Sequence, residues 1–353
     1  MAGGCLTGTA LFAAAAVCLT SGCSSLGYYA QSVGGHLGLM NAARPVSEWL
    51  ADESTPDPLR QRLALTQRIR DYAVSELKLP DNPSYRRYAD LGRPVAVWNV
   101  VAAPELSLVL KTWCFPVVGC VGYRGYFDRA EAEALAAEQR AQGLEVNVYG
   151  VPAYSTLGRL NWLGGDPLLS TFIRYPEGEL ARLVFHELAH QVAYAGDDTT
   201  FNESFATAVE RIGGARWLET QADDAARAAY ERYDARRRDF RALTRKTRDD
   251  LDALYRSDAS DELKRQRKAE IMARMRAEHA ALKAGRWEGF TGYDPWFERA
   301  NNASLGVLAA YNELVPQFER LFEQEGRDFD RFYAAVRRLA ALPKNERRAT
   351  LDR

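Results

Sequence analysis

The 353-residue sequence predicts an α+β protein that is predominantly helical and contains a small mixed sheet. Three observations lead to this fold class. Apolar residues recur at helical spacing over most of the chain. Short runs rich in valine and aromatic residues, typical of strands, are concentrated in residues 95–151. Residues 216–285 are dense in alanine and in charges of both signs around an apolar stripe, which predicts a long helical hairpin.

The N-terminal 43 residues contain no lysine, arginine, aspartate or glutamate, and residues 11–19 form an apolar run too short to span a membrane. The run closes on small residues before Cys23, a pattern that resembles a bacterial lipoprotein signal. We therefore expect residues 1–22 to be a signal segment and Cys23 to carry the lipid. Ser24 resembles the outer-membrane sorting choice, so we expect a protein anchored in the outer membrane, on the periplasmic face of the cell envelope. A plain secretory signal or an uncleaved anchor is the alternative.

The region before residue 152 alternates between helical and strand patterns. Residues 28–79 are predicted to be mostly helical, and residues 128–142 form an alanine-rich helix that closes at a glycine. Strand character appears in four runs, which are residues 95–101, 106–113, 121–127 and 145–151. One helix packed across a small sheet is the expected arrangement.

Cys114 and Cys120 are the cysteines that remain beyond the signal region, with five residues between them. An even remainder in an exported chain predicts one small disulfide loop. Metal binding by these two thiols is the weaker interpretation, because no further cysteine is available to complete such a site.

An H-E-x-x-H sequence, His186-Glu187-Leu188-Ala189-His190, lies within a predicted helix. Histidines four residues apart lie on one face of a helix, so both imidazoles can reach one ion. A catalytic zinc takes three protein ligands and keeps its fourth position for water. Glu187 lies beside that water and can take its proton, which is the chemistry of metal-assisted amide hydrolysis. The alternative is a pair of solvated surface histidines.

A carboxylate is the expected third ligand, because the two other histidines, His36 and His279, lie far away in the sequence. After His190 the helix is predicted to continue to Gly196, and a polar turn at residues 197–200 offers capping side chains for a second helix. This second helix is predicted to begin near residue 201 and to end at the glycine pair 213–214. Glu203 lies in its first turn, where a tight reversal of the chain brings it over the two imidazoles.

Glu210 follows Glu203 by seven residues and falls on the same helical face. This position suits a carboxylate that orients a ligand imidazole through its other ring nitrogen. The alternative is a surface carboxylate paired with Arg211 or Arg216.

The HELAH run followed by NESFA resembles the gluzincin group of zinc peptidases, in which a glutamate on the next helix completes the site. More narrowly, the runs CFPVVGCVGYRGYFD, GRLNWLGGDPLLSTFIRY and NESFATAVE resemble a family of bacterial predicted zinc aminopeptidases, many of them lipoproteins. The resemblance implies a zincin-like core, one Zn²⁺ ion, a peptide substrate and removal of amino-terminal residues. The sequence lacks the G-x-M-E-N run with which another aminopeptidase group grips the substrate amine, so an endopeptidase on the same site stays open.

The resemblance also implies an edge strand beside the metal that pairs with an extended peptide. Residues 122–126 are the candidate, with Tyr123 and Arg124 as substrate-binding residues; the alternative is that both are ordinary strand residues.

The same resemblance implies that the region after residue 289 contributes residues to the active site. Tyr311 is the candidate hydrogen-bond donor that stabilises the oxyanion, and Asn301 and Asn302 are candidate substrate contacts. Packing or helix capping is the alternative for each. Residues 329–342 are predicted to end the fold as a helix, with residues 344–353 as a polar tail.

Taken together, residues 23–353 are expected to form one zincin-like metallopeptidase unit, with residues 216–285 as a hairpin extension that could hold a protein partner. The formal net charge of −1 and the lack of a basic patch argue against nucleic-acid binding. The function expected is zinc-dependent peptide hydrolysis, with Glu187 as base and then as acid. The alternatives are an endopeptidase and a non-catalytic envelope lipoprotein that binds a partner through the hairpin.

Overall fold

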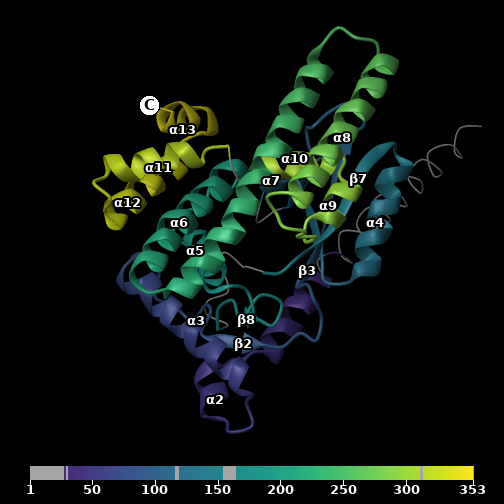
Figure 1. Cartoon of the computed structure of the whole chain (residues 1–353). Helices are drawn as coiled ribbons and strands as arrows, with labels where there is room; N and C mark the ends of the chain where they lie inside the picture. The colour runs from purple at the N-terminus through teal and green to yellow at the C-terminus, as the bar shows by residue number, and fades with distance from the viewer. Residues whose placement is uncertain (1–27, 29–30, 116–118, 154–163, 311–312, 353) are drawn as a thin grey trace, which may run out of the picture.

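The computed structural model describes residue 28 and residues 31–115, 119–153, 164–310 and 313–352. Within these residues the chain is predominantly helical with small sheets, which confirms the predicted fold class (Figure 1). No helix in this described part is both long enough and apolar enough to cross a bilayer. Cys23 and Tyr311 lie outside the described residues, so the lipid anchor and the oxyanion donor stay predictions.

The N-terminal part of the fold combines helices with a first three-stranded sheet. After a helical segment at residues 31–42 come β1 (Arg44–Pro45), α2 (Val46–Ala51), α3 (Asp57–Ser75) and β2 (Arg87–Ala89). β2 is central, antiparallel to β1 and parallel to β8 (Leu168–Leu169). This sheet is mixed, but none of its strands had been predicted, because two or three residues are too few to show a strand period.

A second sheet holds strands from three of the four runs that the sequence predicts in residues 95–151. Its order is β6-β3-β7, all antiparallel, with β3 (Val97–Pro104) between β6 (Arg124–Tyr126) and β7 (Leu144–Val151). α4 (Arg129–Ala141) packs on one face through Ala132, Leu135 and Ala136. The other face, at Val101 and Ala103, packs against Ala303 of α10.

The strand predicted at residues 106–113 is wrong. Residues 107–112 are irregular, and Leu108 and Leu110 pack toward α10 (Asn302–Ala310) instead of pairing in a sheet. A Cβ at Gly306 of that helix would lie 2.7 Å from the Leu108 carbonyl oxygen, so the glycine permits this close approach. The apolar residues that suggested a strand therefore serve tertiary packing.

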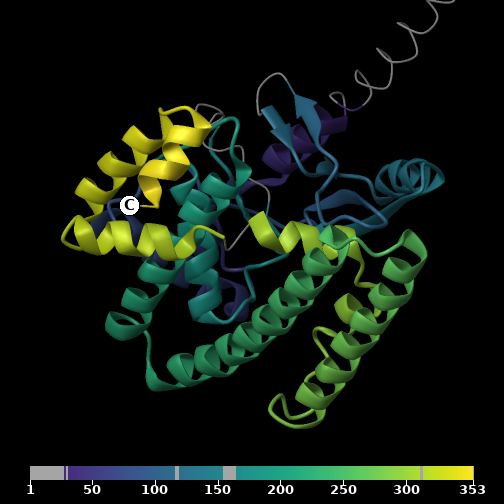
Figure 2. The same ribbon diagram turned by 90° about the horizontal axis from the view of Figure 1, so that it is seen from above.

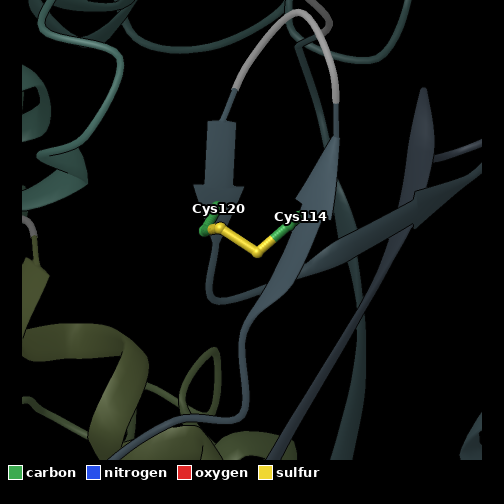
Figure 3. Close-up of a disulfide and its surroundings, with 2 residues drawn as sticks. All are labelled: Cys114 and Cys120. Carbon is green, nitrogen blue, oxygen red and sulfur yellow. A yellow bond between two sulfur atoms is a disulfide. The ribbon is translucent and has the colours of Figure 1, made fainter.

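A two-stranded hairpin follows, with β4 (Trp113–Phe115) antiparallel to β5 (Gly119–Val121). Cys114 and Cys120 are direct cross-strand neighbours, with their Cα atoms 3.9 Å apart, and form a disulfide (Figure 3). The two cysteines are thus joined to each other.

The centre of the molecule is the antiparallel pair α5 (Glu177–Ala189) and α6 (Thr199–Thr220), which lie side by side (Figure 1). The predicted end of α6 at Gly213–Gly214 is wrong, since the helix continues to Thr220. A Cβ on Gly213 would lie 2.6 Å from Leu77 Cδ1, and one on Gly214 would lie 2.5 Å from Arg182 Cγ. These glycines allow α6 to approach α5 and the segment that follows α3 closely, and they do not stop the helix.

The predicted helical hairpin consists of α7 (Asp224–Arg256) and α8 (Asp261–Ala284), which project together from the body (Figures 1 and 2). It begins later than residue 216 because residues 216–220 belong to α6. α9 (Asp294–Arg299) packs beside it, and Phe240, Met275 and Phe297 belong to a separate apolar core. His279 is packed in this region, with its ring stacked on Phe297 at 4.0 Å.

The C-terminal part contains α11 (Val315–Gln324), α12 (Phe329–Ala340) and α13 (Lys344–Leu351), drawn in yellow in Figure 1. The predicted helix at residues 329–342 is present. The predicted polar tail is wrong, because α13 docks through Arg347, whose side chain is only 3% exposed and pairs with Asp198 at 3.1 Å. The charged sequence does not indicate this helix, because its anchors are the ion pair of Arg347 and a single buried leucine, Leu351, too few apolar residues to show a helical period.

Candidate metal centre

The two motif histidines project from the C-terminal end of α5. Leu180, Val184 and Leu188 are fully buried on the opposite side of this helix, so the packing fixes its rotation. His186 lies in the last turn and His190 is the C-cap residue, still in helical conformation. The helix thus ends at Ala189, earlier than Gly196. The Nε2 atoms of the two rings are 3.2 Å apart, so the imidazoles converge and do not point into solvent.

The turn between α5 and α6 is held by side-chain hydrogen bonds. Asp198 caps α6 by accepting from the Phe201 N–H. The Asn202 side chain makes two hydrogen bonds to the backbone of Ala195. Its amide N–H donates to the Ala195 carbonyl oxygen at 2.7 Å, and its amide oxygen accepts from the Ala195 N–H at 2.8 Å. Because Asn202 and Asp198 are both buried, these bonds fix where α6 starts. Glu203 is the next residue and is therefore delivered to the histidines.

Three donor atoms form a compact triangle at this point. Glu203 Oε2 lies 3.4 Å from His186 Nε2 and 3.7 Å from His190 Nε2, and the two Nε2 atoms are 3.2 Å apart. Ligand atoms at roughly 2.0–2.1 Å from a tetrahedral zinc are about 3.3 Å from one another. Glu203 Oε2 is buried and accepts no hydrogen bond within the described part of the chain. This donor set and spacing fit a zinc ion.

The electrostatics of the triangle also favour a cation. Burial alone would raise the pKa of Glu203, but His190 and His186 outweigh it, and the pKa falls well below its usual range. Burial would lower the pKa of His186, but the neighbouring carboxylates of Glu203 and Glu210 outweigh it and raise the pKa well above its ordinary value. A metal ion at this site would therefore displace a proton from His186.

Glu210 orients His186, as predicted from the helical spacing. Its Oε2 lies 3.0 Å from His186 Nδ1, while its Oε1 accepts from Arg182, whose side chain is 3% exposed. The surface alternative fails, since Arg211 pairs with Glu319 and Arg216 donates to the Arg327 carbonyl oxygen. Burial raises the pKa of Glu210, but Arg182 and His186 outweigh it and lower the pKa to about 2, so the carboxylate is ionised.

Arg182 connects this carboxylate to the hairpin. It donates to the Tyr230 hydroxyl at 2.6 Å and lies 3.6 Å from Asp234, both on α7. Arg237, one turn further along α7, reaches back to Glu179 of α5 at 2.8 Å. The orientation of His186 therefore depends on a buried chain of charges that spans α5, α6 and α7.

Glu187 lies between the two ligands and lines the same cavity. Burial raises the pKa of Glu187. The nearby carboxylates of Glu203 and Asp166 raise it further, whereas the two histidines lower it. A raised pKa makes this carboxylate a stronger proton acceptor than a free one, which is the direction that a general base requires.

These residues line a cleft of about 1140 Å³. Tyr123 and Gly125 line it from the side of the second sheet, whereas Arg124 does not and lies over the Tyr28 ring at 4.1 Å. Successive residues of an extended chain point to opposite faces, so Tyr123 lines the cleft while its neighbour Arg124 does not. Burial, and then Glu203, raises the pKa of Tyr123, so its hydroxyl stays protonated and can donate.

β6 is an edge strand, but its free edge is occupied. The Gln31 side chain donates to the Gly125 carbonyl oxygen at 3.3 Å and accepts from the Phe127 N–H at 3.1 Å. These are backbone groups that a substrate strand would use. A peptide that pairs with β6 must therefore displace Gln31.

Asn301 and Asn302 do not line the cleft in the described structure. Asn302 is fully buried, donates to the Glu105 carbonyl oxygen at 2.7 Å and accepts from the Tyr255 hydroxyl at 2.8 Å. Asn301 donates to the Val146 carbonyl oxygen and accepts from the Ser304 N–H. The interpretation of both as substrate contacts is replaced by a structural one, in which they cap α10 and join it to the second sheet.

Sequence patterns do not indicate Arg182 or Asn202, whereas Asp198 belongs to the polar turn that is predicted to cap the second helix. Arg182 lies one turn before His186, and only its buried position distinguishes it from the other arginines of the chain. Asn202 belongs to the NESFA run, and its partner is a backbone group that no sequence pattern identifies.

One comparison with known proteins gives a match. Residues 27–351 match a family model described as “Putative aminopeptidase”. Neither a curated protein nor a solved structure matches the chain. The matched range includes the three donor residues, Glu187, the cleft and the helical hairpin.

Proposed function

We propose that this chain, which belongs to that aminopeptidase family, is a zinc-dependent peptidase that removes amino-terminal residues from peptides. The observation that carries the proposal is the convergence of His186 Nε2, His190 Nε2 and Glu203 Oε2 at separations of 3.2–3.7 Å. The three residues lie in a cleft large enough for several peptide residues.

The zinc ion would supply Lewis-acid polarisation of the peptide carbonyl and of the attacking water. Glu187 takes the proton of that water and returns it to the leaving amine. Glu210 accepts the Nδ1–H of His186, which leaves the Nε2 lone pair directed at the donor triangle. Tyr123 offers a protonated hydroxyl to the cleft and is a candidate donor to the developing oxyanion.

The mechanism is tested by the Glu187→Gln variant. We expect it to keep zinc at one ion per chain and to lose hydrolysis by at least about 100-fold, because the proton acceptor is gone while the ligands remain. The matched control is Glu219→Gln, an exposed residue of α6, which should retain full activity. Unchanged turnover in the Glu187→Gln variant would reject this residue as the base.

An endopeptidase is the alternative on the same site. Peptides with a free amino terminus and their N-acetylated counterparts separate the two, since an aminopeptidase requires the free amine. Equal cleavage of both series assigns the chain as an endopeptidase. Bound zinc with no cleavage of any peptide would favour the non-catalytic envelope protein instead.

A further inference from the structure

The side of the cleft formed by α7 carries a row of arginines. Arg237, Arg241, Arg245 and Arg248 all line the cleft, at spacings of four, four and three residues, so they share one face of the helix. α7 passes beside α5, which carries the motif histidines (Figure 1). The row therefore begins beside Glu179, about two helical turns before His186 on α5, and continues along the cleft.

Only the first of these arginines has its charge matched. Arg237 bonds Glu179 at 2.8 Å and also pairs with Asp234. Arg241, Arg245 and Arg248, here called the arginine wall, make no ion pair or side-chain hydrogen bond within the described part of the chain. Arg248 Nε is buried and has no hydrogen-bond partner there. A guanidinium that loses water without gaining an acceptor costs free energy, so a ligand that brings an acceptor is favoured.

Within the described residues, the acidic side chains of the cleft form no ion pair with the wall, although Glu210 acts on Arg241 and Glu313 on Arg248 from a longer distance. Glu210 is bonded to Arg182, Glu179 to Arg237, and Glu203 to the two histidines. Asp249 and Glu313 also line the cleft, but both are exposed, and Glu313 contacts Arg348 at 3.6 Å. Burial lowers the pKa of Arg241, with Glu210 opposing it, which is the effect of desolvation on an unmatched cation.

We propose that the arginine wall is a carboxylate-binding subsite, so that the preferred substrates are peptides that carry a carboxylate near the scissile bond. The inference rests on the proposed peptidase function. From Arg241 to Arg248 the helix rises about 10 Å, which corresponds to roughly three residues of an extended peptide. Because the wall and the donor triangle line one cleft, a bound peptide can present its carboxylate to the wall while its scissile bond lies at the triangle. The carboxylate is either an acidic side chain or the substrate's C-terminus.

The test uses peptides that differ only in this group. One series of peptide amides carries Asp or Asn at successive positions, and a second compares a neutral peptide with a free C-terminal carboxylate against its amide. A side-chain subsite gives a preference for Asp over Asn of about tenfold or more in kcat/KM at one or two positions. A subsite for the substrate terminus gives the same preference for the free carboxylate over the amide.

Substitutions in the arginine wall test whether it causes the preference for carboxylate-bearing peptides. Arg241→Gln and Arg245→Gln should each remove most of the preference by raising KM for the carboxylate-bearing peptides. Arg245 is exposed, so its replacement leaves the fold intact, and Arg245→Glu should turn the preference toward Lys-containing peptides. Arg232→Gln, on an exposed part of the same helix, is the matched control. Equal rates for all peptides, or a preference that survives the wall variants, would overturn the proposal.

Peptide-binding measurements distinguish failure of the proposed peptidase function from failure of the carboxylate subsite. The Asp and Asn peptides are titrated into the zinc-loaded Glu187→Gln protein and followed by fluorescence anisotropy. Tighter binding of the carboxylate peptides, lost on adding Arg241→Gln, supports the subsite even if the wild-type protein cleaves none of them. Equal binding of both peptides, together with cleavage of both, rejects the subsite and leaves the peptidase in place.

Discussion

At the scale of single residues, the candidate metal centre depends on the partners of its ligands as much as on the ligands. His186 can present Nε2 to a metal only while its other nitrogen is held by Glu210, and Glu210 is held in turn by the buried Arg182. Motif spacing indicated His186, His190 and Glu210, since helical geometry fixes which residues share a face. It could not indicate Arg182, because a charged residue shows its burial only in the folded chain.

The Glu210→Gln variant tests this dependence. The amide has no negative charge to match Arg182 or to polarise the imidazole, so we expect zinc affinity to fall by about 10- to 100-fold. Competition with a chromophoric chelator measures the affinity, and circular dichroism checks that the helices remain. Glu219→Gln is again the control on an exposed part of α6. Unaltered affinity in the Glu210→Gln variant would contradict the orienting role of this carboxylate.

At the scale of elements, α13 secures the start of α6. Asp198 is fully buried, caps α6 and accepts from Arg347 and Arg348, both on α13. This contact joins a segment predicted as a tail to the turn that positions Glu203. Sequence patterns indicate most helices because their apolar faces repeat, but α13 is held by ion pairs and by one buried leucine, Leu351. Sequence patterns also predicted that the second helix ends at Gly213–Gly214, whereas these glycines permit close packing of α6, which continues to Thr220.

The Asp198 cluster predicts a dependence of stability on pH. Burial would raise the pKa of Asp198, but hydrogen bonds from Arg348 and the Phe201 N–H outweigh it, and the pKa is lowered from 3.8. Its contribution is therefore complete above about pH 4 and is lost as the pH falls through the lower value of the folded state. Asp198→Asn should lower the free energy of unfolding by roughly 1–3 kcal/mol at pH 7, because Arg347 and Arg348 lose a buried charged acceptor while Arg347 keeps its ion pair with Asp197.

Urea denaturation at pH 7 and at pH 3 measures both effects. The difference between wild type and Asp198→Asn should be large at pH 7 and should shrink at pH 3. Asp330→Asn, an exposed residue near the start of α12, is the control and should change stability little at either pH. A difference that is the same at both pH values would show that the carboxylate charge does not matter.

At the scale of the whole molecule, the cleft is assembled from distant parts of the chain. The second sheet provides Tyr123, α5 and α6 provide the donor triangle and Glu187, and α7 provides the arginine wall. The sequence indicated the triangle because its ligands lie within 18 residues of one another. It could not indicate the wall or the occupied edge of β6, since both depend on how α7 and residues 31–42 pack against the core.

The central claim is that His186, His190 and Glu203 hold one zinc ion together. The most direct measurement is a zinc titration of the metal-free protein by isothermal calorimetry, with Glu203→Ala and the control Glu219→Ala in parallel. We predict one site per chain in the wild type and in the control, and a loss of at least about 100-fold in affinity for Glu203→Ala, since a charged ligand is removed. Equal affinity of Glu203→Ala and wild type would contradict the claim.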